Sequence, residues 1–155
     1  MKLVPLLLFL HLAAVVVWVG GMFFAYLCLR PVAAEQLEPP QRLALWAGVF
    51  ERFFPWVWSS LVLILGSGLT LFGVIGGSDW HGAPLHWNLM MATGIIMMLI
   101  FAHLYFAPFQ SLRQGVATAD WPRAGEALAQ IRKLVGFNLF LGLITIAIAT
   151  LGIYL

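Results

Sequence analysis

Histidines are the residues of this sequence best suited to binding a metal or a metal-bearing cofactor, and there are four of them. His11 and His103 fall inside long apolar stretches, and His86 falls near the start of the stretch that also contains His103. An ionisable side chain at such a position is costly to place in a membrane, so it is a functional candidate by default. His81 instead falls in the polar segment 77–82, where a histidine usually has no ligand.

His11 and His86 match in depth when each is counted from the proline that closes its apolar stretch. His11 lies 20 residues before Pro31, and His86 lies 22 residues before Pro108. At about 1.5 Å of rise per residue, their depths differ by only about 3 Å. A b-type haem needs two axial imidazoles from different helices. The spacing therefore predicts haem b held by His11 and His86 as axial ligands, with Trp18 and Met90 as walls of its pocket.

A second, inner site is conceivable at His103 and Cys28, which lie 5 and 3 residues before the same two prolines. Imidazole and thiolate both bind soft or borderline metals. A buried thiol is more often a small apolar side chain, however, and an isolated histidine often only forms a hydrogen bond. Both interpretations stay open.

Copper is the alternative to haem at His11 and His86, because imidazoles together with thioethers are the ligands that Cu(I) selects. Five methionines fall in the apolar stretches, namely Met22, Met90, Met91, Met97 and Met98. Adjacent methionines point about 100° apart on a helix, so the two pairs are not ready-made ligand clusters. Most of these methionines are expected to pack.

The elements that must position these residues are membrane helices. Apolar residues make up 63% of the sequence and charged residues only 9%, against roughly 25% charged residues in a soluble domain. Four apolar stretches reach the roughly 20 residues that span a bilayer, at about 3–29, 53–75, 85–107 and 134–154. The sequence predicts an all-α integral membrane four-helix bundle, with one transmembrane domain over residues 1–155.

Other functional classes find little support. The net charge of +2 is too small to suggest nucleic-acid binding. The apolar stretches carry no carboxylate, and no glycine-flanked serine or phosphate-binding loop is visible, so a hydrolase is not indicated. Whether the protein is an enzyme stays open, with a membrane oxidoreductase as the candidate.

The connections between stretches indicate the orientation in the membrane. The first and third connections carry Arg30, Arg42, Arg52, Arg113, Arg123, Arg132 and Lys133, whereas residues 76–84 carry no Lys or Arg. Lysine and arginine in short loops favour the cytoplasmic side. We therefore expect a multi-pass protein of the bacterial inner membrane with both termini in the periplasm.

The two basic connections are also amphipathic. Apolar residues recur with helical spacing after Pro39-Pro40, and again after Asp120, a good N-cap residue. Each connection is expected to form a cytoplasmic interfacial helix. Glycines are expected where spans approach closely, at Gly20, Gly21, Gly66, Gly68, Gly94, Gly136 and Gly142.

Four segments also resemble one known family. They are residues 11–31, which contain His11-Leu12-Ala13-Ala14 and Trp18-Val19-Gly20-Gly21-Met22-Phe23, and residues 53–58, 85–90 and 119–122. Together they are similar to CopD-like proteins, the copper resistance D family, whose architecture is similar to that of membrane cytochromes b and of HemJ. The resemblance implies copper handling or haem binding, with the family's histidines falling at His11 and His86. It implies no counterpart for His103.

These observations lead to three hypotheses. The first is a b-type haem protein of the inner membrane with a redox or electron-transfer role, for which a quinone or a periplasmic protein would be the redox partner. The second is a copper-binding or copper-transport protein. The third is a cofactor-free membrane partner protein. The lipid bilayer is a partner in all three, and self-association into a homo-oligomer stays open.

Overall fold

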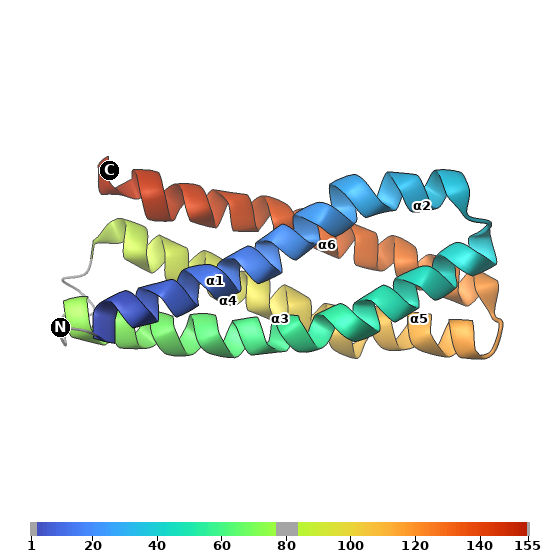
Figure 1. The fold of residues 1–155 in the computed structure, drawn as a ribbon, viewed down its shortest axis with the longest axis horizontal. Helices are drawn as coiled ribbons and strands as arrows, with labels where there is room; N and C mark the ends of the chain where they lie inside the picture. The colour runs from blue at the N-terminus through green and yellow to red at the C-terminus, as the bar shows by residue number, and fades with distance from the viewer. Residues whose placement is uncertain (1–2, 77–83, 155) are drawn as a thin grey trace.

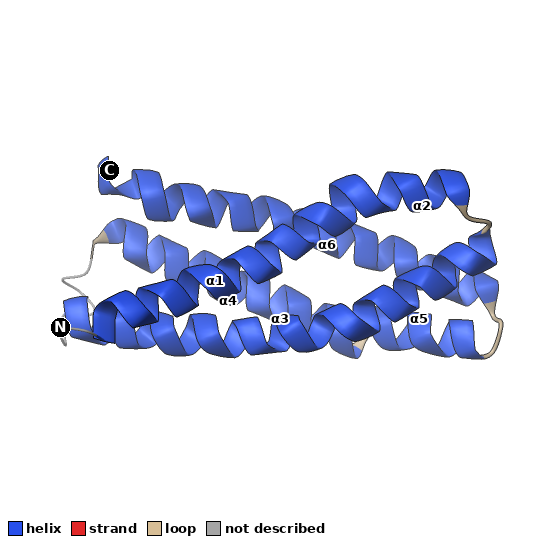
Figure 2. Ribbon diagram, viewed as in Figure 1, coloured by secondary structure: helices blue, strands red, loops and turns tan. Residues whose placement is uncertain are grey.

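The computed structural model describes residues 3–76 and 84–154, and within these ranges it contains helices and no strand. The helices are α1 (Leu3–Phe23), the π-helix η1 (Phe24–Leu29), α2 (Arg30–Gln36), α3 (Pro39–Gly76), α4 (Leu85–Phe106), α5 (Pro108–Ala117), α6 (Trp121–Leu151) and the 3₁₀-helix η3 (Gly152–Tyr154). Figure 2 shows how little loop joins them. The expected all-α fold is confirmed.

These helices form four long rods, each long and apolar enough to cross a membrane. The candidate spans are Leu3–Gln36, Pro39–Ile75, Leu85–Ala117 and Trp121–Leu151. The rods run up and down in one elongated bundle, with both chain ends at the same end of it (Figure 1). This arrangement confirms the expected multi-pass membrane protein with four spans.

The rods are longer than a bilayer requires. At about 1.5 Å per residue, the 38 residues of α3 extend about 57 Å. The hydrocarbon core of a bilayer is only about 30 Å thick. Each rod therefore has room for a second portion beyond the apolar stretch that crosses the membrane.

The described residues show no separate interfacial helix at either of the two expected places. α3 runs without interruption from Pro39 to Gly76, and α6 runs from Trp121 to Leu151. No helix-breaking residue lies between Pro40 and Pro55 except the exposed Gly48, so nothing ends the amphipathic segment before the span begins. Each amphipathic segment is consequently the first part of a spanning helix, and its apolar face packs inside the bundle.

The turn from α5 to α6 follows the local sequence closely. The carboxylate of Asp120 accepts a hydrogen bond from the Arg123 backbone N–H at 3.2 Å, which confirms Asp120 as the N-cap of α6. Ala119 has a φ of 56°, in the left-handed region. A Cβ on Gly115 would lie 2.9 Å from the backbone nitrogen of Ala124, so only glycine allows α5 and α6 to approach this closely.

An aromatic core holds the middle of the bundle together. The ring of Phe54 lies 4.7 Å from Phe109 and 5.3 Å from Phe101, centroid to centroid. The ring of Phe50 stacks on Phe54 at 5.0 Å, and Trp58 lies 5.2 Å from Phe101. Aromatic pairs of this kind add about 0.5–1.5 kcal/mol each beyond the area they bury. The core joins α3, α4 and α5 near the centre of the rods.

Candidate functional site

His11 lies half-buried on α1 and faces α3. Its Nδ1 atom lies 2.9 Å from the hydroxyl oxygen of Ser67. A Cβ on Gly68 would lie 3.3 Å from His11 Cε1, so the absence of a side chain at Gly68 makes room for the imidazole. Ser67 and Gly68 together create a place for one histidine between the apolar stretches of α1 and α3.

The hydrogen bonds of Ser67 favour one tautomer of His11. The Ser67 hydroxyl donates to the backbone carbonyl of Leu63, one turn earlier on α3. With its hydrogen in that bond, the hydroxyl oxygen can accept a hydrogen bond from His11, which favours the tautomer that carries its proton on Nδ1. The Nε2 atom then has a free lone pair, which is the form of imidazole that binds a metal.

His86 lies near the start of α4 and packs elsewhere. A Cβ on Gly152 would lie 2.5 Å from His86 Cβ, so this histidine packs closely against η3 at the end of the α6 rod. His11 and His86 therefore lie against different elements, α3 for His11 and η3 for His86. Within residues 3–76 and 84–154, no group of three or more His, Cys, Asp or Glu side chains is placed to hold a metal. The haem ligation by His11 and His86 thus gains no support and stays a prediction.

The other predicted site residues are dispersed. Cys28 and His103 are both exposed on the outside of their helices, so the predicted inner site gains no support either. Met90 is half-buried on α4, and its carbonyl accepts a hydrogen bond from the Thr93 hydroxyl at 3.1 Å. His81 lies outside the described residues.

Trp18 is the predicted pocket residue that does line a cavity. It is buried and lies beside an apolar cavity of about 230 Å³, together with Met22, Phe54 and Asn138. Met90 is not among the lining residues, so the structure does not join the two predicted pocket walls at this cavity.

Polar residues that the sequence analysis passed over also lie inside the bundle. Asn138 donates a hydrogen bond from Nδ2 to the carbonyl of Met97 at 3.3 Å, while its Oδ1 atom is buried without a partner. The hydroxyl of Thr145 lies 2.8 Å from that of Thr93, which links α6 to α4. Their position in the sequence could have identified them, because a polar side chain in an apolar span usually faces another helix.

Comparison with known protein families places most of the chain in a known family. Residues 47–151 match the family model for copper resistance protein D. The matched segment covers α4, α5, α6 and most of α3, and it leaves out α1 with His11, η1 and α2. No curated protein and no solved structure matches the chain. Because the matched segment is more than half of the sequence, the chain belongs to the copper resistance protein D family, CopD.

Proposed function

We propose that this protein handles copper within the membrane, as cargo rather than as a resident cofactor, and that His11 is the ligand that receives it. Two observations support the proposal. The chain belongs to a copper resistance family. The Ser67 contact favours the tautomer in which Nε2 of His11 has a free lone pair, and this contact carries the assignment of the residue.

The surroundings of His11 favour a soft monovalent ion. Within the described spans, the apolar stretches carry no Asp or Glu that would compensate a divalent cation. Imidazole and thioether ligands suit Cu(I), whereas carboxylates suit harder cations. Copper at His11 would be Cu(I) on this argument.

One face of α1 could carry the ion onward. Met22 lies 11 residues after His11, which is close to three turns of α-helix, so the two residues share a face. Their separation of about 16 Å is too large for one metal site, but it suits two successive stations. A passing ion must be bound strongly enough to enter and weakly enough to leave, and single soft ligands satisfy both demands.

The orientation is part of the proposal. Within residues 3–76 and 84–154, every Asp, Glu, Lys and Arg lies at the end of the bundle opposite the chain termini. The positive-inside tendency then supports periplasmic termini in a bacterial inner membrane. Copper would reach His11 from the periplasmic side.

Copper binding by the purified protein tests the proposal. The full chain in detergent is loaded with Cu(I) under reducing conditions and titrated with a chromogenic Cu(I) chelator. We expect His11→Ala to lose the retained copper, and Ser67→Ala, which frees the ring to reorient, to weaken binding by about tenfold. His103→Ala is the control, because His103 is exposed on the outside of α4.

Unchanged copper binding by His11→Ala would refute the proposal. An absorption spectrum of the same samples distinguishes the other two hypotheses. A Soret band that is lost in both His11→Ala and His86→Ala would establish that the protein binds haem. The next step would then be a search for its redox partner. If the natural chain contains neither copper nor a chromophore, the role of His11 is only to join α1 to α3 through its contact with Ser67.

A further inference from the structure

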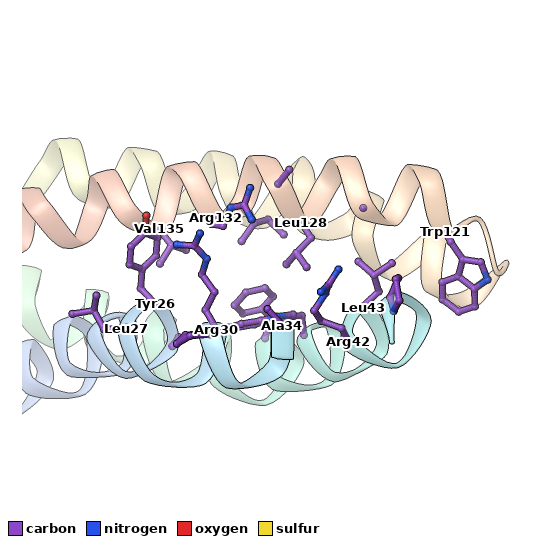
Figure 3. Close-up of a pocket in the computed structure, with 18 residues that line it drawn as sticks. Tyr26, Leu27, Arg30, Ala34, Arg42, Leu43, Trp121, Leu128, Arg132 and Val135 are labelled. Atoms are coloured by element: carbon purple, nitrogen blue, oxygen red, sulfur yellow. The ribbon is translucent and has the colours of Figure 1, made fainter. Parts of the chain in front are cut away.

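A groove at the charged end of the bundle is not used by the proposed function. It has a volume of about 770 Å³ and lies between η1, α2 and α3 on one side and α6 on the other. Arg30, Arg42 and Arg132 all line it, and no Asp or Glu is among its lining residues. Figure 3 shows Arg30 and Arg42 extending across the groove toward α6, on which Arg132 lies.

Among the described residues, the three arginines have no acidic partner. In the part of the chain that the structure describes, one ion pair is present, between Arg113 and Glu51 at 3.3 Å, and it lies outside the groove. The guanidinium of Arg30 instead lies 5.0 Å from the centre of the Tyr26 ring. Three like charges around one groove repel one another and attract an anion, since a concave surface concentrates their field.

The backbone is arranged to bring two of these arginines together. A Cβ on Gly136 would lie 2.9 Å from the Tyr26 ring, so glycine at this position admits the ring against α6. Tyr26 belongs to the π-helix η1, and π-helical turns are rare and often occur at functional sites. Arg30 follows Tyr26 by four residues and Arg132 precedes Gly136 by four, so this contact places the two arginines on facing helices.

The groove lies where a membrane surface would be. Arg30 directly follows the first apolar stretch, and Arg132 comes just before the last one. The remainder of the lining is largely apolar and includes Leu43, Trp46, Phe50, Leu128, Ile131 and Val135. Phe50 and Val135 also line the smaller apolar cavity described above, so an apolar surface continues from the arginines into the bundle.

We infer that this groove binds an anionic phospholipid, with the phosphate among Arg30, Arg42 and Arg132 and an acyl chain along Phe50 and Val135. Basic pockets between membrane helices on the cytoplasmic side suit anionic lipid headgroups. A free phosphate would contact the arginines but leave the apolar surface uncovered. The inference does not depend on copper binding.

Native mass spectrometry of the detergent-purified protein tests the inference, with phosphatidylglycerol and phosphatidylcholine of identical acyl chains as probes. We expect the natural chain to retain phosphatidylglycerol in preference to phosphatidylcholine. In Arg30→Gln/Arg132→Gln, binding of phosphatidylglycerol should fall about ten- to thirtyfold, while binding of phosphatidylcholine should not change.

The matched control is Arg52→Gln/Lys133→Gln. It removes the same charge from the same end of the bundle, and neither residue lines the groove. We expect it to retain phosphatidylglycerol within about twofold of the natural chain. Circular dichroism checks that both double variants fold.

Three results would overturn the inference. An equal loss in the control would show general attraction between charges rather than a site. Equal retention of the two lipids by the natural chain, which requires no variant, would show that the arginines do not select the headgroup. Displacement of the lipid by millimolar inorganic phosphate would show a site for a free anion.

Discussion

The two ends of the bundle are built in opposite ways from the same four rods. The uncharged end comprises residues 3–29, 53–76, 84–107 and 134–154, and the charged end comprises residues 30–52 and 108–133. Large exposed apolar side chains lie at the uncharged end, with Val32 as the exception. The buried polar side chains, Ser60, Ser67 and Asn138, lie there too.

The charged end resembles a soluble protein. Its charged side chains are largely exposed, and its apolar residues face inward. Leu112, Ala124 and Ile131 are all 0% exposed and belong to this end. The difference shows that each rod is folded for two solvents, lipid along one portion and water along the other.

The forces that hold the two ends together must therefore differ. In water, removing apolar surface from the solvent drives packing. In lipid that driving force is missing, so close packing and hydrogen bonds between helices take its place. Three matched pairs of substitutions examine this contrast, beginning with the largest expected effect.

The largest effect is expected for Leu112→Ala, at the charged end. Leu112 is fully buried, and truncating a buried leucine costs about 2–5 kcal/mol because it leaves a cavity. The matched change is Leu99→Ala at the uncharged end, where the side chain is 65% exposed and the expected cost is about 0.5 kcal/mol or less. Thermal unfolding in detergent measures both. Equal costs would contradict the contrast between the two ends.

A smaller effect is expected for Asp120→Ala, which removes the N-cap of α6 at the charged end. The loss of one hydrogen bond to the helix terminus should cost about 1 kcal/mol, since water can satisfy the Arg123 N–H only in part. Glu126→Ala removes one carboxylate from an exposed position later in the same helix and is the control. A similar loss of thermal stability in both variants would indicate that charge, rather than capping, is what Asp120 contributes.

The smallest effect is expected for Thr145→Val at the uncharged end. This change removes the hydroxyl that lies 2.8 Å from Thr93 Oγ1 across two helices, and such bonds contribute about 0.6 kcal/mol in membrane proteins. Thr150→Val is the control, because the Thr150 hydroxyl bonds only within α6. Urea or mixed-micelle unfolding should separate the two variants. A larger effect of Thr150→Val would show that this interhelical bond does not stabilise the bundle.

The glycines show how accurately a sequence pattern predicts close contacts between helices. Seven were expected at close helix contacts, and Gly21, Gly68, Gly136 and Gly142 do lie where a Cβ would crowd a neighbour. Gly20, Gly66 and Gly94 have nothing within 4 Å of such an atom. Gly20 and Gly21 are adjacent and differ in outcome, because neighbouring residues on a helix point about 100° apart.

The histidines show the same limit at the candidate site. Counting along the chain placed His11 and His86 at similar depths, but depth does not fix the rotation of a helix about its axis. The structure directs His11 toward Ser67 and His86 toward Gly152. The sequence gives no reason to single out Ser67, because serine is common in membrane helices. Only its position opposite His11 in the folded bundle identifies it as part of the candidate site.

The sequence by itself determined the four apolar spans, the asymmetry of charge between the two ends and the N-cap at Asp120. These features depend on composition and on residues close together in the chain. Tertiary structure alone decided that the amphipathic segments continue the spanning helices, that the hydroxyl of Ser67 meets His11, and that Arg30, Arg42 and Arg132 line one groove. Each of these depends on how one helix is rotated against another, and that rotation is set by the packing of all four rods together.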